Sequence, residues 1–198
     1  MAIVISADEI KKTLPNYAPE KAEMFHRESA KLADRDFADK LKEASFKKAI
    51  LLCGGAASGK TEFLATHLMN LKSCLIFDAT LSTEEGASIK LKKISKSKAK
   101  QIIYAVVPDD LKRAFVAFLH RDRKFSDSHF YKTHSGSRRT LLWIAKNCSD
   151  VEINIVESSY VKHRKLQFSK LKFDNRRLLI SYLTDLQLDE TGIIDKLI

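Results

Sequence analysis

The segment from Gly54 to Thr61 has the residue types and the spacing that phosphate binding requires. Four small residues separate Gly54 from Gly59, and Lys60 and Thr61 follow, as in the pattern G-x-x-x-x-G-K-[ST]. Small side chains let backbone N–H groups curl around phosphate oxygens, and a helix that begins near Gly59 directs its positive end at the anion. The Lys60 ammonium suits the β- and γ-phosphates of a nucleotide, and the Thr61 hydroxyl suits Mg²⁺.

The residues on both sides of this segment support the same interpretation. Ile50–Cys53 is apolar, as expected for a short buried strand, and Phe63–Leu68 is compatible with a helix. The alternative is a glycine-rich turn between strand and helix that binds nothing. We therefore predict a site for ATP or GTP with Mg²⁺. Its predicted nucleotide-binding residues are Gly54, Gly55, Ala56, Ala57, Ser58, Gly59, Lys60, Thr61 and Glu62.

An acidic residue, Asp78, directly follows a second apolar run, Ser73–Phe77. A carboxylate at the end of a strand beside a phosphate loop can hold Mg²⁺ or accept the proton of a substrate hydroxyl. In the other interpretation, Asp78 only caps the following turn. We predict that Asp78 takes part in catalysis, in metal binding with Thr61 and in substrate binding, and that Thr80 contacts the substrate.

Arg121 and Arg123 lie in a polar segment that follows an apolar helical pattern. Phosphoryl transfer needs cations around the migrating group, so both arginines and Lys60 are candidate catalytic residues, although a solvated basic loop would have the same composition. His129 and His134 are candidate substrate contacts. No third ligand accompanies these histidines, so the sequence does not predict a histidine metal site.

The chain has 198 residues, a formal net charge of +10 and three cysteines without metal-like spacing. Its apolar runs are too short to span a membrane and its first residues lack the layout of a secretory signal, so we expect a cytoplasmic protein without membrane partners. The positive charge favours anionic partners. Because the lysines are dispersed with few aromatic residues between them, a basic surface around a nucleotide site is favoured over a nucleic-acid groove.

Apolar runs alternate with helical patterns along the chain, which predicts an α/β fold with a parallel sheet and helices on both faces. The phosphate motif narrows this class to a three-layer P-loop NTPase or kinase-like fold. Residues 1–45 are expected to form an N-terminal helical arm, packed on a core of residues 46–198 within one structural domain. The expected strands are 50–53, 73–77, 101–107 and 151–156, and the expected helices include 61–71, 137–146 and 174–188.

Four segments of the chain follow the order and spacing of one known family: Phe25–Phe37, Leu51–Glu62, Leu75–Thr83 and Arg123–His134. They resemble the helical arm, the nucleotide loop, the E/D-G-T-L strand and the G-R-x-V-P…H segment of the zeta-toxin family of P-loop kinases. The resemblance runs from residue 19 to residue 156. Only the nucleotide loop is specific by itself, and the other segments contribute through their order.

The resemblance implies a kinase that transfers the γ-phosphoryl group of ATP or GTP to a hydroxyl of a small substrate, such as a UDP-amino-sugar. It also implies a toxin that is held by an antitoxin protein. Lys60 would hold the phosphates and Thr61 the Mg²⁺, Asp78 and Thr80 would contact substrate or metal, and Arg123 would neutralise charge.

Two features depart from the pattern of that family. The chain runs directly from Leu71 to Asp78, without room for the additional strand of longer members, so the sequence offers no separate base. Asp122 stands where the family has the glycine of its G-R pair. Two other functions stay open: a nucleotide-binding interaction module or toxin-like protein without kinase turnover, and a nucleic-acid-dependent NTPase.

Overall fold

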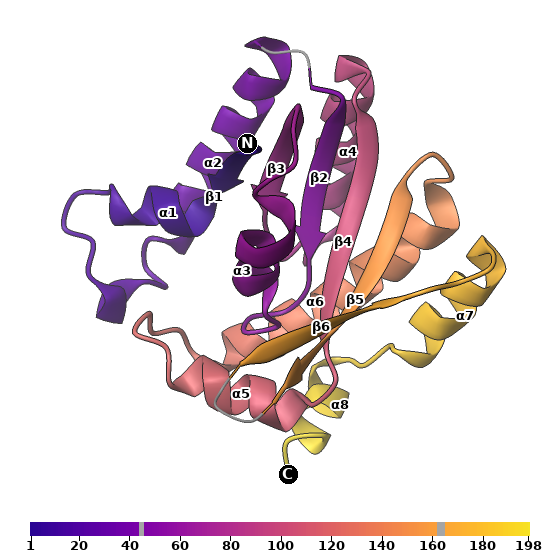
Figure 1. Ribbon diagram of the computed structural model, residues 1–198. Coiled ribbons are helices and arrows are strands. Elements are labelled where there is room, and N and C mark those ends of the chain that lie inside the picture. Colours follow the sequence, from indigo (N-terminus) through magenta and orange to yellow (C-terminus); the bar gives the residue numbers. More distant parts are fainter. Residues whose placement is uncertain (44–45, 162–164) are drawn as a thin grey trace.

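The computed structural model describes residues 1–43, 46–161 and 165–198. Its strands are β1 (Ile3–Ser6), β2 (Lys48–Cys53), β3 (Cys74–Asp78), β4 (Lys100–Pro108), β5 (Glu152–Tyr160) and β6 (Leu166–Leu171). They form one six-stranded sheet in the order β1-β3-β2-β4-β5-β6 (Figure 1). All neighbouring pairs are parallel except β5 and β6, which are antiparallel. The chain is therefore an α/β protein with a mostly parallel sheet, as predicted.

Helices cover both faces of this sheet (Figure 1). The helical elements are α1 (Ala7–Lys12), η1 (Pro19–Lys21), α2 (His26–Glu43), α3 (Lys60–Phe63), η2 (Leu64–Leu68), α4 (Glu84–Ser97), α5 (Leu111–Leu119), α6 (Asp127–Asn147), α7 (Arg176–Asp185) and α8 (Glu190–Asp195). The apolar stripes of α2, α4, α6 and α7 pack on one face, and α3 with the π-helical turn η2 packs on the other. Alternate residues of each strand supply the two cores, as the period of a strand requires.

The first strand, β1, was not expected from the sequence. Ile3–Ser6 pairs in parallel with Leu75–Asp78 of β3, so the N-terminal segment contributes an edge strand of the sheet as well as the predicted helices. Residues 6–9 have the sequence form of a capping box, but Ser6 ends β1 and makes no capping hydrogen bond with its side chain. This strand therefore brings the residues after Ser6 to the same edge of the sheet as Asp78.

Other element boundaries also differ from those expected. Helix α6 begins at Asp127 rather than near residue 137, so it includes His129 and His134. The antiparallel strand β6 alternates between half-buried and exposed residues, and it was not among the strands expected from the sequence. The predicted end of the arm helix near Ala44 and the predicted domain boundary at residue 45 lie outside the described residues.

The longest described helix, α6, has 21 residues, but it carries lysine, histidine and arginine side chains along its length. Within the described ranges, no helix combines the length and the apolar character needed to cross a membrane.

The packing of α2 on the sheet leads to a stability prediction. Phe37 is fully buried, and its ring meets that of Phe77 edge-on with centroids 4.9 Å apart. Phe37→Ala should leave a cavity and lower the free energy of unfolding by about 3–5 kcal/mol, measured by urea denaturation. The control is Val116→Ala, because Val116 is 54% exposed and its truncation should change stability by less than about 0.5 kcal/mol. Equal effects of the two changes would contradict this packing.

Candidate functional site

The glycine-rich loop joins the end of β2 to the start of α3, as the sequence predicted. Two of its glycines adopt positive φ angles, 141° at Gly54 and 88° at Gly59, which other residues rarely adopt. A side chain on Gly54 would also overlap the carbonyl oxygen of Val106 in β4. The N–H of Gly54 donates to the carbonyl of Thr80, 3.1 Å away. The loop is thus held against the neighbouring chain segments by contacts that only glycine permits.

The underside of the loop rests on helix α6. Nε2 of His134 lies 2.8 Å from the carbonyl oxygen of Ala56, and the N–H of Ala56 donates to the Thr133 hydroxyl at 3.0 Å. A side chain on Gly55 would overlap the ring of His134. His134 is only 2% exposed, and burial lowers its pKa to about 3. The predicted substrate contact therefore lies beneath the loop, where it supports the backbone, and it does not border the cleft described below.

The upper side of the loop presents hydrogen-bond donors. Nζ of Lys60 donates to the carbonyls of Gly54 and Gly55, each 2.8 Å away. Among the described residues, no acceptor pairs with the amide N–H groups of Ala57, Gly59 and Lys60. Unpaired amides that lie close together in a loop leading into a helix can form a concave site for an anion. Burial lowers the pKa of Lys60 to about 8, against the opposing effect of Asp78.

These donors open into a cleft of about 600 Å³ at the carboxyl ends of the strands. Its walls come from the loop, the segment after β3, the N-terminal segment and the segment after α5. The predicted residues that line it are Ala56, Ala57, Ser58, Gly59, Lys60, Thr61, Glu62, Asp78, Thr80, Arg121 and Arg123, and His129 borders it as well. Residues from distant parts of the sequence thus meet here, because parallel strands bring their carboxyl ends to one edge.

Asp78 and Thr61 line this cleft together. Asp78 ends β3, and Thr61 lies in the first turn of α3 and is exposed to solvent. Burial raises the pKa of Asp78 above its ordinary value, while Lys60 acts in the opposite direction. A carboxylate and a hydroxyl are oxygen ligands of the kind that Mg²⁺ prefers, alongside water and phosphate. The two side chains therefore supply oxygen atoms of the kind that could hold a magnesium ion.

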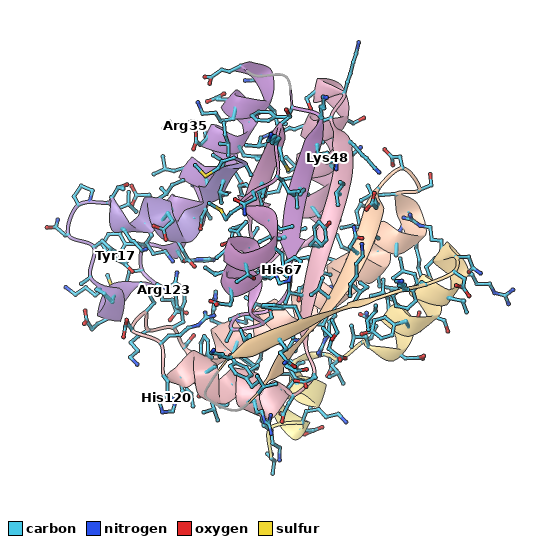
Figure 2. The ribbon with its side chains drawn as sticks, viewed as in Figure 1. Tyr17, Arg35, Lys48, His67, His120 and Arg123 are labelled. Carbon is cyan, nitrogen blue, oxygen red and sulfur yellow. The ribbon has the colours of Figure 1, made fainter. Side chains whose placement is uncertain are left out.

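The arginines lie beside a carboxylate that the sequence analysis did not single out. Asp8, at the start of α1, forms ion pairs with Arg123 through Oδ2 and with Lys11 through Oδ1. Lys11 has no exposed surface, and its ammonium lies 4.8 Å from the centre of the Phe125 ring. Burial lowers the pKa of Arg121. In Figure 2, Arg123 lies between Tyr17 of the N-terminal segment and His120 at the end of α5.

A second cleft, of about 700 Å³, lies on the other side of this charged group. It is bordered by β1, α1, η2 and the segment after α5. Five residues line both clefts and form the wall between them: Asp8, Thr61, Asp78, Arg121 and Arg123.

The far end of the first cleft is polar and is lined partly by small residues. Lys90 of α4 pairs with Asp34 of α2 at 2.8 Å and lies 4.9 Å from the centre of the Phe77 ring. The hydroxyls of Thr80 and Ser82 lie 3.4 Å apart. This end offers charges, hydroxyls and space for a polar compound next to the phosphate loop.

One pattern in the sequence could have indicated that Asp8 belongs to the site. Ile3–Ser6 is a short apolar run followed closely by an acid, as Ser73–Phe77 is followed by Asp78. The run has only four strand residues and precedes a capping-box pattern, which favours a helix start. Its pairing with β3 depends on contacts across about 70 residues of sequence, which no local pattern reports.

The chain has no match among protein-family models, and no curated protein matches it in sequence. Within the described residues, no group of three or more histidine, cysteine or acidic side chains is arranged to hold a metal ion by itself. A metal at Asp78 and Thr61 would therefore need ligands from a bound nucleotide and water.

The burial of His134 leads to a pH prediction. The unfolded chain binds a proton at His134 near pH 6.5, whereas the folded protein resists this until about pH 3. The free energy of unfolding is therefore highest above pH 6.5. It decreases as the pH falls towards 3, by up to about 1.4 kcal/mol per pH unit. We expect the loss between pH 6 and pH 4, measured by urea denaturation, to be about 2 kcal/mol smaller in His134→Gln than in the unsubstituted protein.

Glutamine retains an N–H group that can reach the Ala56 carbonyl but does not titrate in this range. The matched control is His120→Gln, because His120 is exposed to solvent. This variant should follow the pH dependence of the unsubstituted protein. A His134→Gln variant with an unchanged acid slope would show that His134 is not the buried titrating group.

Proposed function

We propose that the protein is a Mg²⁺-dependent kinase that transfers the γ-phosphoryl group of ATP or GTP to a hydroxyl of a small substrate. One observation carries the proposal: the unpaired loop amides, Lys60 and Asp78 face the same cleft. Amides without a protein acceptor need a ligand or water, so their position on the cleft supports an anion site better than a turn that binds nothing.

The phosphates would lie on the loop. The amides of Ala57, Gly59 and Lys60 are directed to a bound anion, and the helix that follows adds the positive end of its dipole. Nζ of Lys60 would exchange its two carbonyl contacts for phosphate oxygens. A pKa near 8 keeps much of Lys60 protonated at neutral pH, and a bound polyanion would raise this value further.

Thr61 and Asp78 would hold Mg²⁺ with their hydroxyl and carboxylate oxygens. When bound, the ion would neutralise charge on the β- and γ-phosphates. The buried Asp78 keeps its pKa raised until a cation approaches, so metal binding would favour its ionised form.

Arg121 and Arg123 would stabilise the charge of the phosphoryl group in transit. Both line the cleft, and both come from the same short segment after α5. Guanidinium groups suit this role because they stay charged and bind phosphate oxygens in pairs. Positioning and charge neutralisation are the main requirements of phosphoryl transfer, and these residues supply both.

The arrangement of the chain is compatible with a P-loop kinase-like fold. The loop follows the third strand in the sheet order, and Asp78 ends the strand next to it. The resemblance to zeta toxins is a second support, and it suggests a UDP-amino-sugar as the first acceptor to test and a small antitoxin protein as a partner. The polar far end of the cleft, with Asp34, Lys90 and several hydroxyls, has groups that bind such a polyhydroxylated compound.

Substitution of Lys60 tests the proposal. Lys60→Ala removes a charge-assisted contact to the phosphates, worth about 1.5–3 kcal/mol, so ATP or GTP should bind about 10- to 100-fold more weakly. Binding is measured with a fluorescent nucleotide in the presence of Mg²⁺. Transfer is measured by mass spectrometry of a metabolite extract incubated with γ-labelled nucleotide.

The matched control is Lys146→Ala, which removes an exposed lysine of α6 and should change neither measurement. Unchanged binding and transfer in Lys60→Ala would refute the proposal. Nucleotide binding by the unsubstituted protein without any labelled product would instead favour a nucleotide-binding interaction module.

A further inference from the structure

Two carboxylates meet at the cleft from neighbouring parallel strands. Ser6 of β1 pairs with Asp78 of β3, and Asp8 follows Ser6 by two residues. Both carboxylates border both clefts. We propose that Asp8, which precedes the glycine-rich loop by more than forty residues of sequence, accepts the proton of the acceptor hydroxyl during phosphoryl transfer. This inference rests on the function proposed above.

Asp78 is committed to the nucleotide side of the site. It ends the strand next to the loop, and Lys60 is the charge that most favours its ionised form. A carboxylate that donates its electron pairs to a metal ion is a poor proton acceptor. A separate group for the acceptor hydroxyl is therefore required, and among the described cleft residues Asp8 is the carboxylate closest in register to Asp78.

Asp8 is held in place by two cations. Arg123 engages Oδ2, and Lys11 engages Oδ1 at 3.2 Å. Burial alone would raise the pKa of Asp8, but Arg123 and Lys11 together lower it below its ordinary value. The side chain nevertheless stays 40% exposed, and each carboxylate oxygen has a second lone pair. Asp8 is thus an ionised, oriented and accessible hydrogen-bond acceptor.

The remaining acids of the first cleft differ from Asp8 in position. Asp34 pairs with Lys90 at the far end of the cleft, and Glu62, on the first turn of α3, lines the first cleft but not the second. His26 and His129 stack around Phe125, and burial lowers the pKa of both histidines. In the part of the chain that the structure describes, no carboxylate is hydrogen-bonded to either histidine in a way that could orient it as a base.

In the proposed step, the acceptor oxygen attacks the γ-phosphorus while its O–H proton is directed at Asp8. The bond between the γ-phosphorus and the oxygen that bridges it to the β-phosphate breaks, and the nucleoside diphosphate leaves with that electron pair. The proton passes to Asp8 and then to water. Because the transition state is loose, the hydroxyl becomes acidic only late, so an oriented carboxylate of low pKa suffices.

The N-terminal segment also holds the arginines. Glu23 accepts hydrogen bonds from the N–H and the hydroxyl of Ser126, at 3.0 and 2.8 Å, and the N–H of Lys124 donates to the carbonyl of Pro19 at 3.0 Å. The ion pair between Asp8 and Arg123 is therefore one of several contacts between these segments. It fixes the distance between the proton acceptor and a cation of the transition state.

Asp8→Asn tests the assignment, because asparagine has nearly the same shape but cannot take the proton. Labelled product formed from γ-labelled ATP or GTP and a metabolite extract should fall by about 100- to 10,000-fold. Affinity for a fluorescent nucleotide should stay within about threefold, because Asp8 does not contact the phosphates. The control is Glu9→Gln, which makes the same charge change at an exposed neighbour paired only with Lys12 among the described residues and should retain full transfer.

A second variant distinguishes a purely structural role of Asp8 from the proposed catalytic role. If Asp8 served only to neutralise the buried Lys11, then Asp8→Asn combined with Lys11→Met would restore transfer, because methionine leaves no buried charge. Recovery in this double variant would overturn the proposal, and continued loss with normal nucleotide binding would support it. If the unsubstituted protein transfers no label, the proposed kinase function fails first. If it transfers label and Asp8→Asn does so equally, only the role of Asp8 is refuted.

Discussion

The close approach of the glycine-rich loop to its neighbours is the constraint on which the site depends. Gly54 lies against the backbone of β4 and Gly55 against the ring of His134, at separations that exclude any side chain. The loop amides can face the cleft because the opposite side of the loop is fixed by His134, which contacts the Ala56 carbonyl, and by the Thr80 carbonyl, which accepts from the Gly54 N–H. The support from α6 is apolar as well as polar, since Ala56 and Ala57 pack with the buried aromatic residues of α5 and α6. A rigid underside therefore lets the upper side keep its donors available to a ligand or to water.

Electrostatics at the cleft follow from the sheet. Parallel strands have their carboxyl ends at the same edge of the sheet, so Asp78 lies close to the residues that follow Ser6 and Cys53. Charges taken out of water need partners, and Lys11 and Arg123 find theirs in Asp8. The ammonium of Lys60 donates to two loop carbonyls, and the charge of Asp78 favours the protonated form of Lys60. The two carboxylates then differ in character, because Asp78 has a raised pKa and Asp8 a lowered one. Such divergence between neighbouring acids is a frequent basis for distinct roles in catalysis.

Much of the central fold could be predicted from local sequence. The apolar runs that became β2, β3, β4 and β5 lie between helical patterns, and the motif identified the loop and the start of α3. The edge strands could not be predicted in this way. β1 is four residues long and looks like the approach to a helix, and β6 alternates in a manner that polar loops share. For the site, the motif predicted the loop residues directly. Asp78 was predicted from its position at a strand end, and the arginines were predicted from the polar segment that follows a helix. His134 was assigned to the substrate because its residue type suggests chemistry, whereas its burial under the loop depends on long-range packing that spacing does not encode.

The N-terminal segment links stability to the site. Lys11 is buried without exposed surface, and its ion pair with Asp8 is the contact that compensates its desolvation among the described residues. An apolar residue of similar size at this position would stabilise a fold at least as well, because buried ion pairs often contribute little net stability. A buried lysine is therefore better explained by what it does to its partner. It keeps Asp8 ionised and limits its rotation, while Phe125 covers the lysine from the side of the arginine segment. The same contacts that close the N-terminal segment onto the sheet thus set the charge and the orientation of a carboxylate in the cleft.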